Sequence, residues 1–235
     1  MKETLNKIME RVPPRLSLSQ WLLIASMFSL LLLSIRIINT RQLSYGFLAW
    51  NLFLAYVPYF ISKWLGKHPK VLASRIKLIP LVFTWILFMP NSFYILTDLF
   101  HLNNVSKGDS WYDLTLILSF AWNGILFGIV SIYKMEMLLK RTKARLPDRQ
   151  GKFIAGLIIC AVMWLNAFGI YIGRFLRFNS WDIFVNPFSL ISEIVDIIFN
   201  PYDYRYVWAM SFCFAFFMAI LYYTTKRLGD VFKNG

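Results

Sequence analysis

Residues 87–101 read LFMPNSFYILTDLFH, which sets an aspartate and a histidine into an otherwise apolar stretch. Four polar side chains recur there three or four residues apart, which an α-helix displays as one stripe: Asn91, Tyr94, Asp98 and His101. A carboxylate or an imidazole near a membrane interface can serve as a general base, so Asp98 and His101 are candidate catalytic residues. A charge in hydrocarbon costs about 2.5–3.5 kcal/mol on insertion scales. We therefore expect the stripe to face other helices.

Two later segments offer partners on the same predicted side of the membrane. Asp113 ends the sequence WYD at the start of another apolar run and is the third candidate catalytic residue. The sequence GRFLRFNSWD ends a further apolar run, and arginines can hold a phosphate or carboxylate by forked hydrogen bonds. The candidate substrate-binding residues are Asn91, Tyr94, Arg174, Arg177, Asn179 and Asp182. We expect three helices to pool these side chains in one pocket.

The sequence favours neither a zinc site nor a cofactor site. The chain has only two histidines and two cysteines, so a three-histidine metal site cannot be assembled. It also lacks a nucleophile motif and a phosphate-binding glycine loop. We predict no cofactor, and keep open a divalent cation on the oxygens of Asp113 and Asp182.

The elements that must position these residues are membrane helices. Hydrophobic residues make up 58% of the chain and the mean hydropathy is +0.54, whereas soluble domains contain about 45–50% apolar residues. Backbone amides in lipid must pair within their own helix. We predict one all-α membrane domain over residues 1–235, with six spans near residues 21–35, 43–61, 78–99, 114–133, 153–173 and 206–224.

The net charge of +13 is distributed unevenly along this predicted topology. If the six spans alternate, all but six of the 25 basic residues share one side of the membrane with the two termini. The six on the other side are Arg36, Arg41, Lys107, Arg174, Arg177 and Arg205. The positive-inside rule then places both termini in the cytoplasm and the protein in the plasma membrane. The predicted partners of the basic residues are membrane lipids, and the net charge does not require nucleic acid as a partner.

The segment between the last two spans predicts a further, short helix. Within NPFSLISEIVDIIFNP, polar residues recur at helical spacing and apolar residues fill the other face. This pattern predicts an amphipathic helix over about residues 187–199 that lies in the outer interface. A re-entrant dip into the membrane is the alternative.

Three of these motifs resemble a known family. MPNSFYILTDLFHL, WYDL followed by FAWNG, and GIYIGRFLRFNSWD are similar to the bacterial multispan proteins of domain-of-unknown-function family 1361. The resemblance extends from about residue 80 to 182. It implies a bacterial inner-membrane protein and implies no reaction.

Three functions fit these residues. The first is recognition or modification of an anionic lipid or envelope substrate on the outer face, because ionisable residues within membranes are commonly functional. The second is a non-catalytic scaffold, in which the aspartates pair with Arg174 and Arg177 and the chain binds a protein partner or a second copy of itself. The third is transport of a small solute, although the sequence lacks a pair of matching broken helices.

Overall fold

The computed structural model describes residues 16–104, 110–142 and 148–234, and these residues form helices and turns without a strand. The all-α prediction is confirmed. The helices are α2 (Leu18–Thr40), α3 (Phe47–Leu65), α4 (Pro69–Leu72), α5 (Arg75–Tyr94), the 3₁₀-helix η1 (Ile95–Asn104), α6 (Ser110–Thr142), α7 (Asp148–Arg174), α8 (Asp182–Val185), α9 (Pro187–Phe199) and α10 (Arg205–Asn234).

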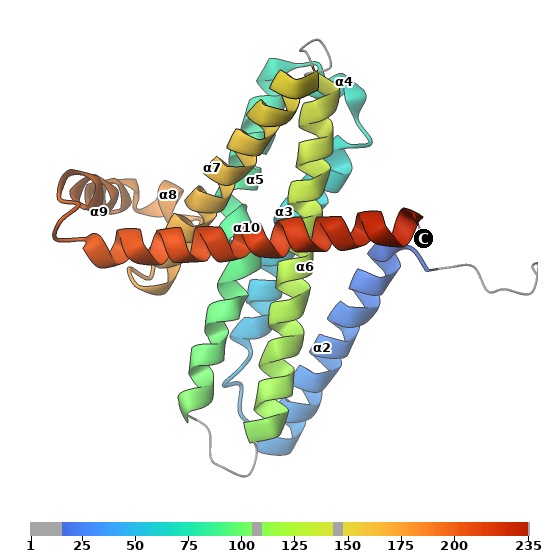
Figure 1. Cartoon of the computed structure of the whole chain (residues 1–235). Coiled ribbons are helices and arrows are strands. Elements are labelled where there is room, and N and C mark those ends of the chain that lie inside the picture. Colours follow the sequence, from blue (N-terminus) through green and yellow to red (C-terminus); the bar gives the residue numbers. More distant parts are fainter. Residues whose placement is uncertain (1–15, 105–109, 143–147, 235) are drawn as a thin grey trace, which may run out of the picture.

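Helix α6 is the centre of the bundle. It contributes residues to both large apolar clusters, one shared with α3, α5, α7 and α10 and the other with α2, α3 and η1. Its most apolar stretch is 67% buried, compared with 17% for α2 and 22% for α10. In Figure 1, α2 and α7 lie along different parts of α6, and α10 crosses the bundle transversely.

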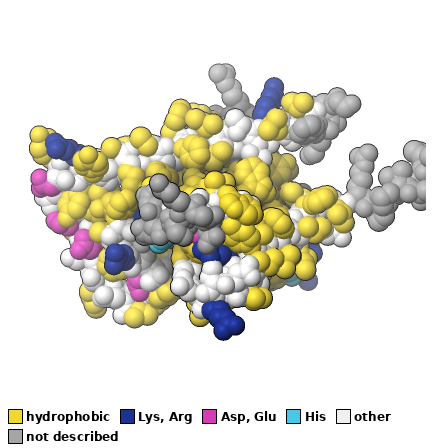
Figure 2. Space-filling view, turned by 90° about the horizontal axis from the view of Figure 1, so that it is seen from below, with side chains coloured by type: hydrophobic (Ala, Val, Ile, Leu, Met, Phe, Trp, Pro, Cys, Tyr) yellow, Lys and Arg dark blue, Asp and Glu magenta, His cyan; other side chains and the backbone are white. Residues whose placement is uncertain are grey.

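The outer helices expose large apolar side chains. Leu23 and Met27 on α2, and Phe212 and Phe216 on α10, are each at least 60% exposed. Figure 2 shows hydrophobic side chains over much of the face seen from below, with charged groups scattered between them. An apolar surface of this extent is typical of contact with lipid.

Five described helices are long and apolar enough to span a membrane, namely α2, α6, α7, α10 and the segment Arg75–Leu102 formed by α5 and η1. The second predicted span, near residues 43–61, corresponds to α3, which is not among the five. Helix α3 contains Asn51 and Pro58, and many of its side chains are buried against α5 and α6. Its neighbours thus provide much of its environment, which permits a less apolar sequence.

The predicted polar stripe does not lie on one regular α-helix. Helix α5 ends at Tyr94 and the chain continues as a 3₁₀-helix from Ile95. Residues three apart eclipse each other in a 3₁₀-helix. Asp98 and His101 therefore share one face, while Asn91 and Tyr94 belong to the α-helical turns before the change.

Helix α9 begins at Pro187 and ends at Phe199, as the amphipathic pattern predicts. Leu190 and Ile197 are buried, whereas several other apolar side chains of α9 are exposed. The turn to α10 is closed by Tyr204, whose hydroxyl donates to Asp196 over 2.6 Å. This hydrogen bond raises the pKa of Tyr204 to about 12, so the hydroxyl stays a donor at neutral pH.

Helix α5 is held between glycine-containing faces of α6 and α7. A Cβ atom at Gly124 of α6 would lie 2.8 Å from the carbonyl oxygen of Ser92, and one at Gly169 of α7 would lie 2.5 Å from Cγ of Pro90. Small residues let membrane helices approach this closely. The contacts fix the segment that precedes Asp98.

We expect Gly169→Ala to destabilise the protein by about 1–3 kcal/mol, because the added methyl group meets the stiff ring of Pro90. Gly156→Ala on the same helix is the matched control, since a Cβ there meets nothing within 4 Å. Thermal unfolding in detergent should show a lower melting temperature for the first variant alone. Equal melting temperatures for the two variants would contradict the close approach.

Candidate functional site

The first polar group surrounds Asp98, which is 1% exposed. Asn51 Nδ2 of α3 donates to Asp98 Oδ2 over 3.0 Å. Arg174, the last residue of α7, brings Nη1 to 3.7 Å from Asp98 Oδ1 and to 3.4 Å from His101 Nε2. The predicted proximity of Asp98, His101 and Arg174 is therefore seen in the structure, and Asn51 is a partner that the sequence did not indicate.

The side chain of Arg174 contacts its neighbours but remains partly exposed. Its side chain is 19% exposed, and its guanidinium lies 5.6 Å from the centre of the Phe100 ring. Charge-assisted hydrogen bonds span about 2.7–2.9 Å. The 3.7 Å contact with Asp98 is an ion pair beyond that range, so Arg174 retains donors for another anion.

A cavity of about 450 Å³ lies next to this group, among α3, α5, α7, α9 and the segment between α7 and α8. Most of its lining is apolar and includes Trp50 and Leu54 of α3, Phe168 of α7, and Ile194 and Ile198 of α9. A cavity of this size suits a small organic ligand or part of a larger one.

The polar lining of the cavity includes Asn51, whose amide also reaches Asp98. Asn91 Nδ2 donates to Ser180 Oγ over 2.9 Å, so α5 is tied to the segment that follows α7. Tyr94 and Asn179 also line the cavity. Three predicted binding residues, Asn91, Tyr94 and Asn179, thus surround one space.

Asp182 and Arg177 take other positions. The Asp182 carboxylate accepts from the backbone N–H of Asn179 over 2.5 Å, which shapes the turn into α8. Arg177 follows the end of α7 with a φ of 60° and is exposed. Arg174 and Arg177 lie three residues apart in the sequence but do not share a helical face, because α7 ends at Arg174.

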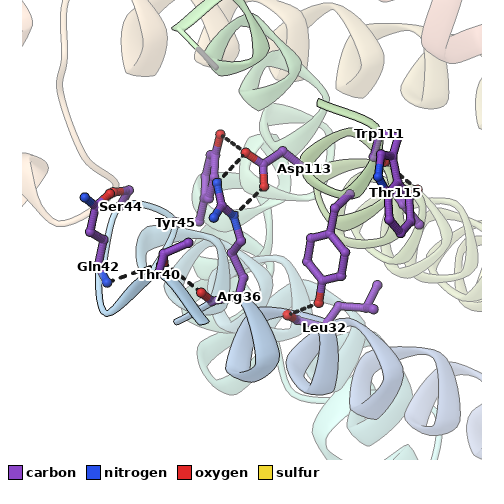
Figure 3. Close-up of polar contacts among 10 residues, drawn as sticks. Leu32, Arg36, Thr40, Gln42, Ser44, Tyr45, Trp111, Asp113 and Thr115 are labelled. Atoms are coloured by element: carbon purple, nitrogen blue, oxygen red, sulfur yellow. Dashed lines mark hydrogen bonds and ion pairs between the residues drawn. The ribbon is translucent and has the colours of Figure 1, made fainter. Parts of the chain in front are cut away.

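Asp113 belongs to a separate polar group, shown in Figure 3. Arg36 of α2 donates from Nε to Oδ1 over 2.6 Å and from Nη2 to Oδ2 over 2.9 Å, and Tyr45 adds a hydrogen bond of 3.2 Å to Oδ2. Asp113 is completely buried.

The expectation of a single pocket for all candidate residues therefore needs correction. Asp113 was expected to pair with Arg174 or Arg177, but Arg36 occupies both of its oxygens. The charge map had already put Arg36 on the same side as Asp113. The packing of α2 against α6, which brings Arg36 to Asp113, could not be predicted from the sequence.

A third buried carboxylate, Glu136 of α6, was also missed. Lys140 lies 2.7 Å away and Lys226 Nζ reaches both carboxylate oxygens at 2.7 and 2.6 Å, while Tyr222 donates a further hydrogen bond. The spacing of Glu136 and Lys140 was a readable signal for an ion pair. The partners on α10, Lys226 and Tyr222, had no such signal in the sequence.

No group of three or more histidine, cysteine or acidic residues suited to a metal ion occurs in the described segments. Asp113 and Asp182, the carboxylates considered for a divalent cation, have the different partners given above. The geometry therefore gives the cation alternative no support.

The fold and these polar groups define a multi-pass helical membrane protein with ionisable residues inside its bundle. The chain belongs to the DUF1361 family of proteins of unknown function, whose family model matches residues 50–221. No curated protein and no solved structure matches the chain. The match contains every candidate residue named from the sequence, but not Arg36 or Tyr45.

We expect Arg36 and Asp113 to be energetically coupled, because removing one partner leaves the other charge buried. Arg36→Met and Asp113→Asn should each cost about 3–5 kcal/mol. The double variant should lose less than the sum, by about 0.5–3 kcal/mol. Unfolding in mixed micelles measures the cycle, and Arg41→Met, at an exposed arginine of the same helix end, is the control. Strictly additive losses would contradict the coupling.

Proposed function

We propose that this protein recognises an anionic amphiphile, such as a membrane or envelope lipid, in the cavity among α3, α5, α7 and α9. One observation carries the proposal: Asn51 lines a largely apolar cavity and also hydrogen-bonds Asp98, which stands beside Arg174. A polar recognition group next to an apolar space is complementary to a charged head with a hydrocarbon tail.

The roles of the residues follow from their positions. The apolar lining would take hydrocarbon, and the amides of Asn91 and Asn179 would hydrogen-bond polar atoms of the head. Arg174 would supply the positive charge, because its ion pair with Asp98 is long and its side chain is partly exposed. Asp98 would hold Arg174 in place.

Modification of the bound ligand is the catalytic form of the same proposal. Asp98 and His101 both contact Arg174, so a general base and a cation would lie close to a ligand head that extends from the cavity past Asn51. This form predicts that His101→Ala abolishes turnover while binding persists, once a ligand has been identified.

We further propose six spans in a bacterial plasma membrane, with both termini in the cytoplasm and α9 in the outer interface; this proposal requires α10, which crosses the bundle transversely in Figure 1, to lie along the other spans in the membrane. Helix α3 has 19 residues, which gives a length of about 28 Å, close to the roughly 30 Å of a bilayer core. Its burial against α5 and α6 supports its place as the second span.

The scaffold alternative has its own support in the Arg36–Asp113 pair. This pair has two short hydrogen bonds around a fully buried carboxylate, which is a typical arrangement for joining helices. We assign Asp113 this structural role in place of catalysis. Transport would require solute flux through liposomes containing the protein.

Filling the cavity should remove its ligand. We expect Ile194→Trp, at a cavity-lining position of α9, to abolish binding of an anionic lipid in this cavity, so that one fewer lipid co-purifies with the protein. Ile191→Trp, at an exposed position outside the cavity on the same helix, should retain it. Native mass spectrometry with lipid extraction measures the difference. Loss in both variants, or no bound lipid in the unmodified protein, would contradict the proposal.

The topology predicts opposite accessibility for two exposed positions. In a Cys160→Ala, Cys213→Ala background, we expect Leu43→Cys to react with a membrane-impermeant maleimide in intact cells, because residue 43 would lie outside. Lys70→Cys should react only after permeabilisation. The reverse pattern would invert the proposed orientation.

A further inference from the structure

A second hollow lies between the C-terminal part of α3 and the facing part of α6. Its volume is about 350 Å³, and Lys63, Lys67 and Lys134 line it together with Tyr133. Lys63 and Lys134 are half-buried, whereas Lys67 is exposed. Three cations thus surround a space that holds no acidic side chain.

Within residues 16–104, 110–142 and 148–234, no acidic side chain forms an ion pair with these lysines. The ion pairs formed within the described residues involve other cations, namely Arg36, Lys140, Arg174 and Lys226. The negative end of the α3 dipole accounts for cations at Lys63 and Lys67. It does not account for Lys134, which lies about two turns before the end of α6.

An apolar groove of about 350 Å³ meets this basic hollow at Lys63, which lines both spaces. The groove lies between α2 and α3, with Leu22, Ala49 and Phe53 among its walls. Lys63 Nζ donates to Ser19 Oγ over 3.2 Å and lies 5.5 Å from the centre of the Tyr59 ring, so its stem is held where the two spaces meet.

From this arrangement we infer a binding site for an anionic phospholipid, with the phosphate among Lys63, Lys67 and Lys134 and an acyl chain in the groove between α2 and α3. Charge complementarity determines the head, because three unpaired lysines attract an anion and a zwitterionic head offers no net charge. The adjoining groove distinguishes a lipid from free phosphate. The site lies at the basic end of the bundle and is independent of the proposed outer cavity.

Lipid titrations followed by native mass spectrometry test the head-group part. We expect the protein to bind phosphatidylglycerol about tenfold more tightly than phosphatidylcholine with the same chains. In the Ile194→Trp background, in which the outer cavity is filled, the double variant Lys67→Gln, Lys134→Gln should lose this preference. The matched control Lys70→Gln, Lys77→Gln removes the same charge at exposed positions outside the hollow and should keep it.

The acyl-chain part is tested with two serines of α2 that make the same hydrogen bond to the preceding helical turn. Ser26→Trp fills the groove and should weaken the binding of long-chain phosphatidylglycerol several-fold. Ser34→Trp lies outside the groove and should leave this binding unchanged. Inorganic phosphate should not displace the lipid at millimolar concentration.

Three results would overturn the inference. They are equal affinity for the two lipids in the unmodified protein, equal loss in both lysine double variants, and displacement by inorganic phosphate. The first would mean unspecific contact with lipid, the second a diffuse surface charge, and the third a site for the free anion. Melting temperatures of all variants ensure that losses of binding are not losses of fold.

Discussion

The close approach of α5 to α6 and α7 is the constraint on which the rest of the structure depends. The carbonyl of Ser92 and the ring of Pro90 occupy space that a single methyl group at Gly124 or Gly169 would fill. In a bilayer, helices gain little from hiding apolar surface from each other, so van der Waals packing and interhelical hydrogen bonds must hold them together. Ser92 contributes to both, because its hydroxyl also donates to the carbonyl of Ala55 on α3 over 3.2 Å.

This packing explains how a membrane protein accommodates the polar segment that follows. Immediately beyond the contact, the chain changes from α-helix to 3₁₀-helix, and Asp98 and His101 come to one face. Arg174 can reach both only because α7 ends where α5 is held against it through Gly169 and Gly173. The cavity adjoins the same contact, since Pro90, Gly169 and Gly173 are among the residues that line it.

The sequence predicted the elements better than it predicted their partners. Helix positions and the amphipathic segment 187–199 follow from hydropathy and periodicity, which are local properties. The grouping of Asp98, His101 and Arg174 was also predicted from the sequence. The free-energy cost of placing these side chains in lipid favours their burial together inside the bundle. The partners of Asp113 did not, since Arg36 lies 77 residues away and its approach depends on the packing of α2 against α6. Asn51 was equally hidden, because a lone amide in an apolar helix has no periodic signal.

The charges of the chain fall into two kinds with different consequences. Asp98, Asp113 and Glu136 are buried, and each has an arginine or lysine beside it, as an unpaired buried charge would cost several kcal/mol. Those ion pairs join helices. They involve only a few of the basic residues, so most of the positive charge of the chain has another role. The excess positive charge includes side chains such as Lys67 and Lys134, which are exposed or half-buried and have no ion pair within the described residues. Positive charge that folding does not require remains available to a ligand, and in a membrane the most abundant anion within its reach is a lipid phosphate.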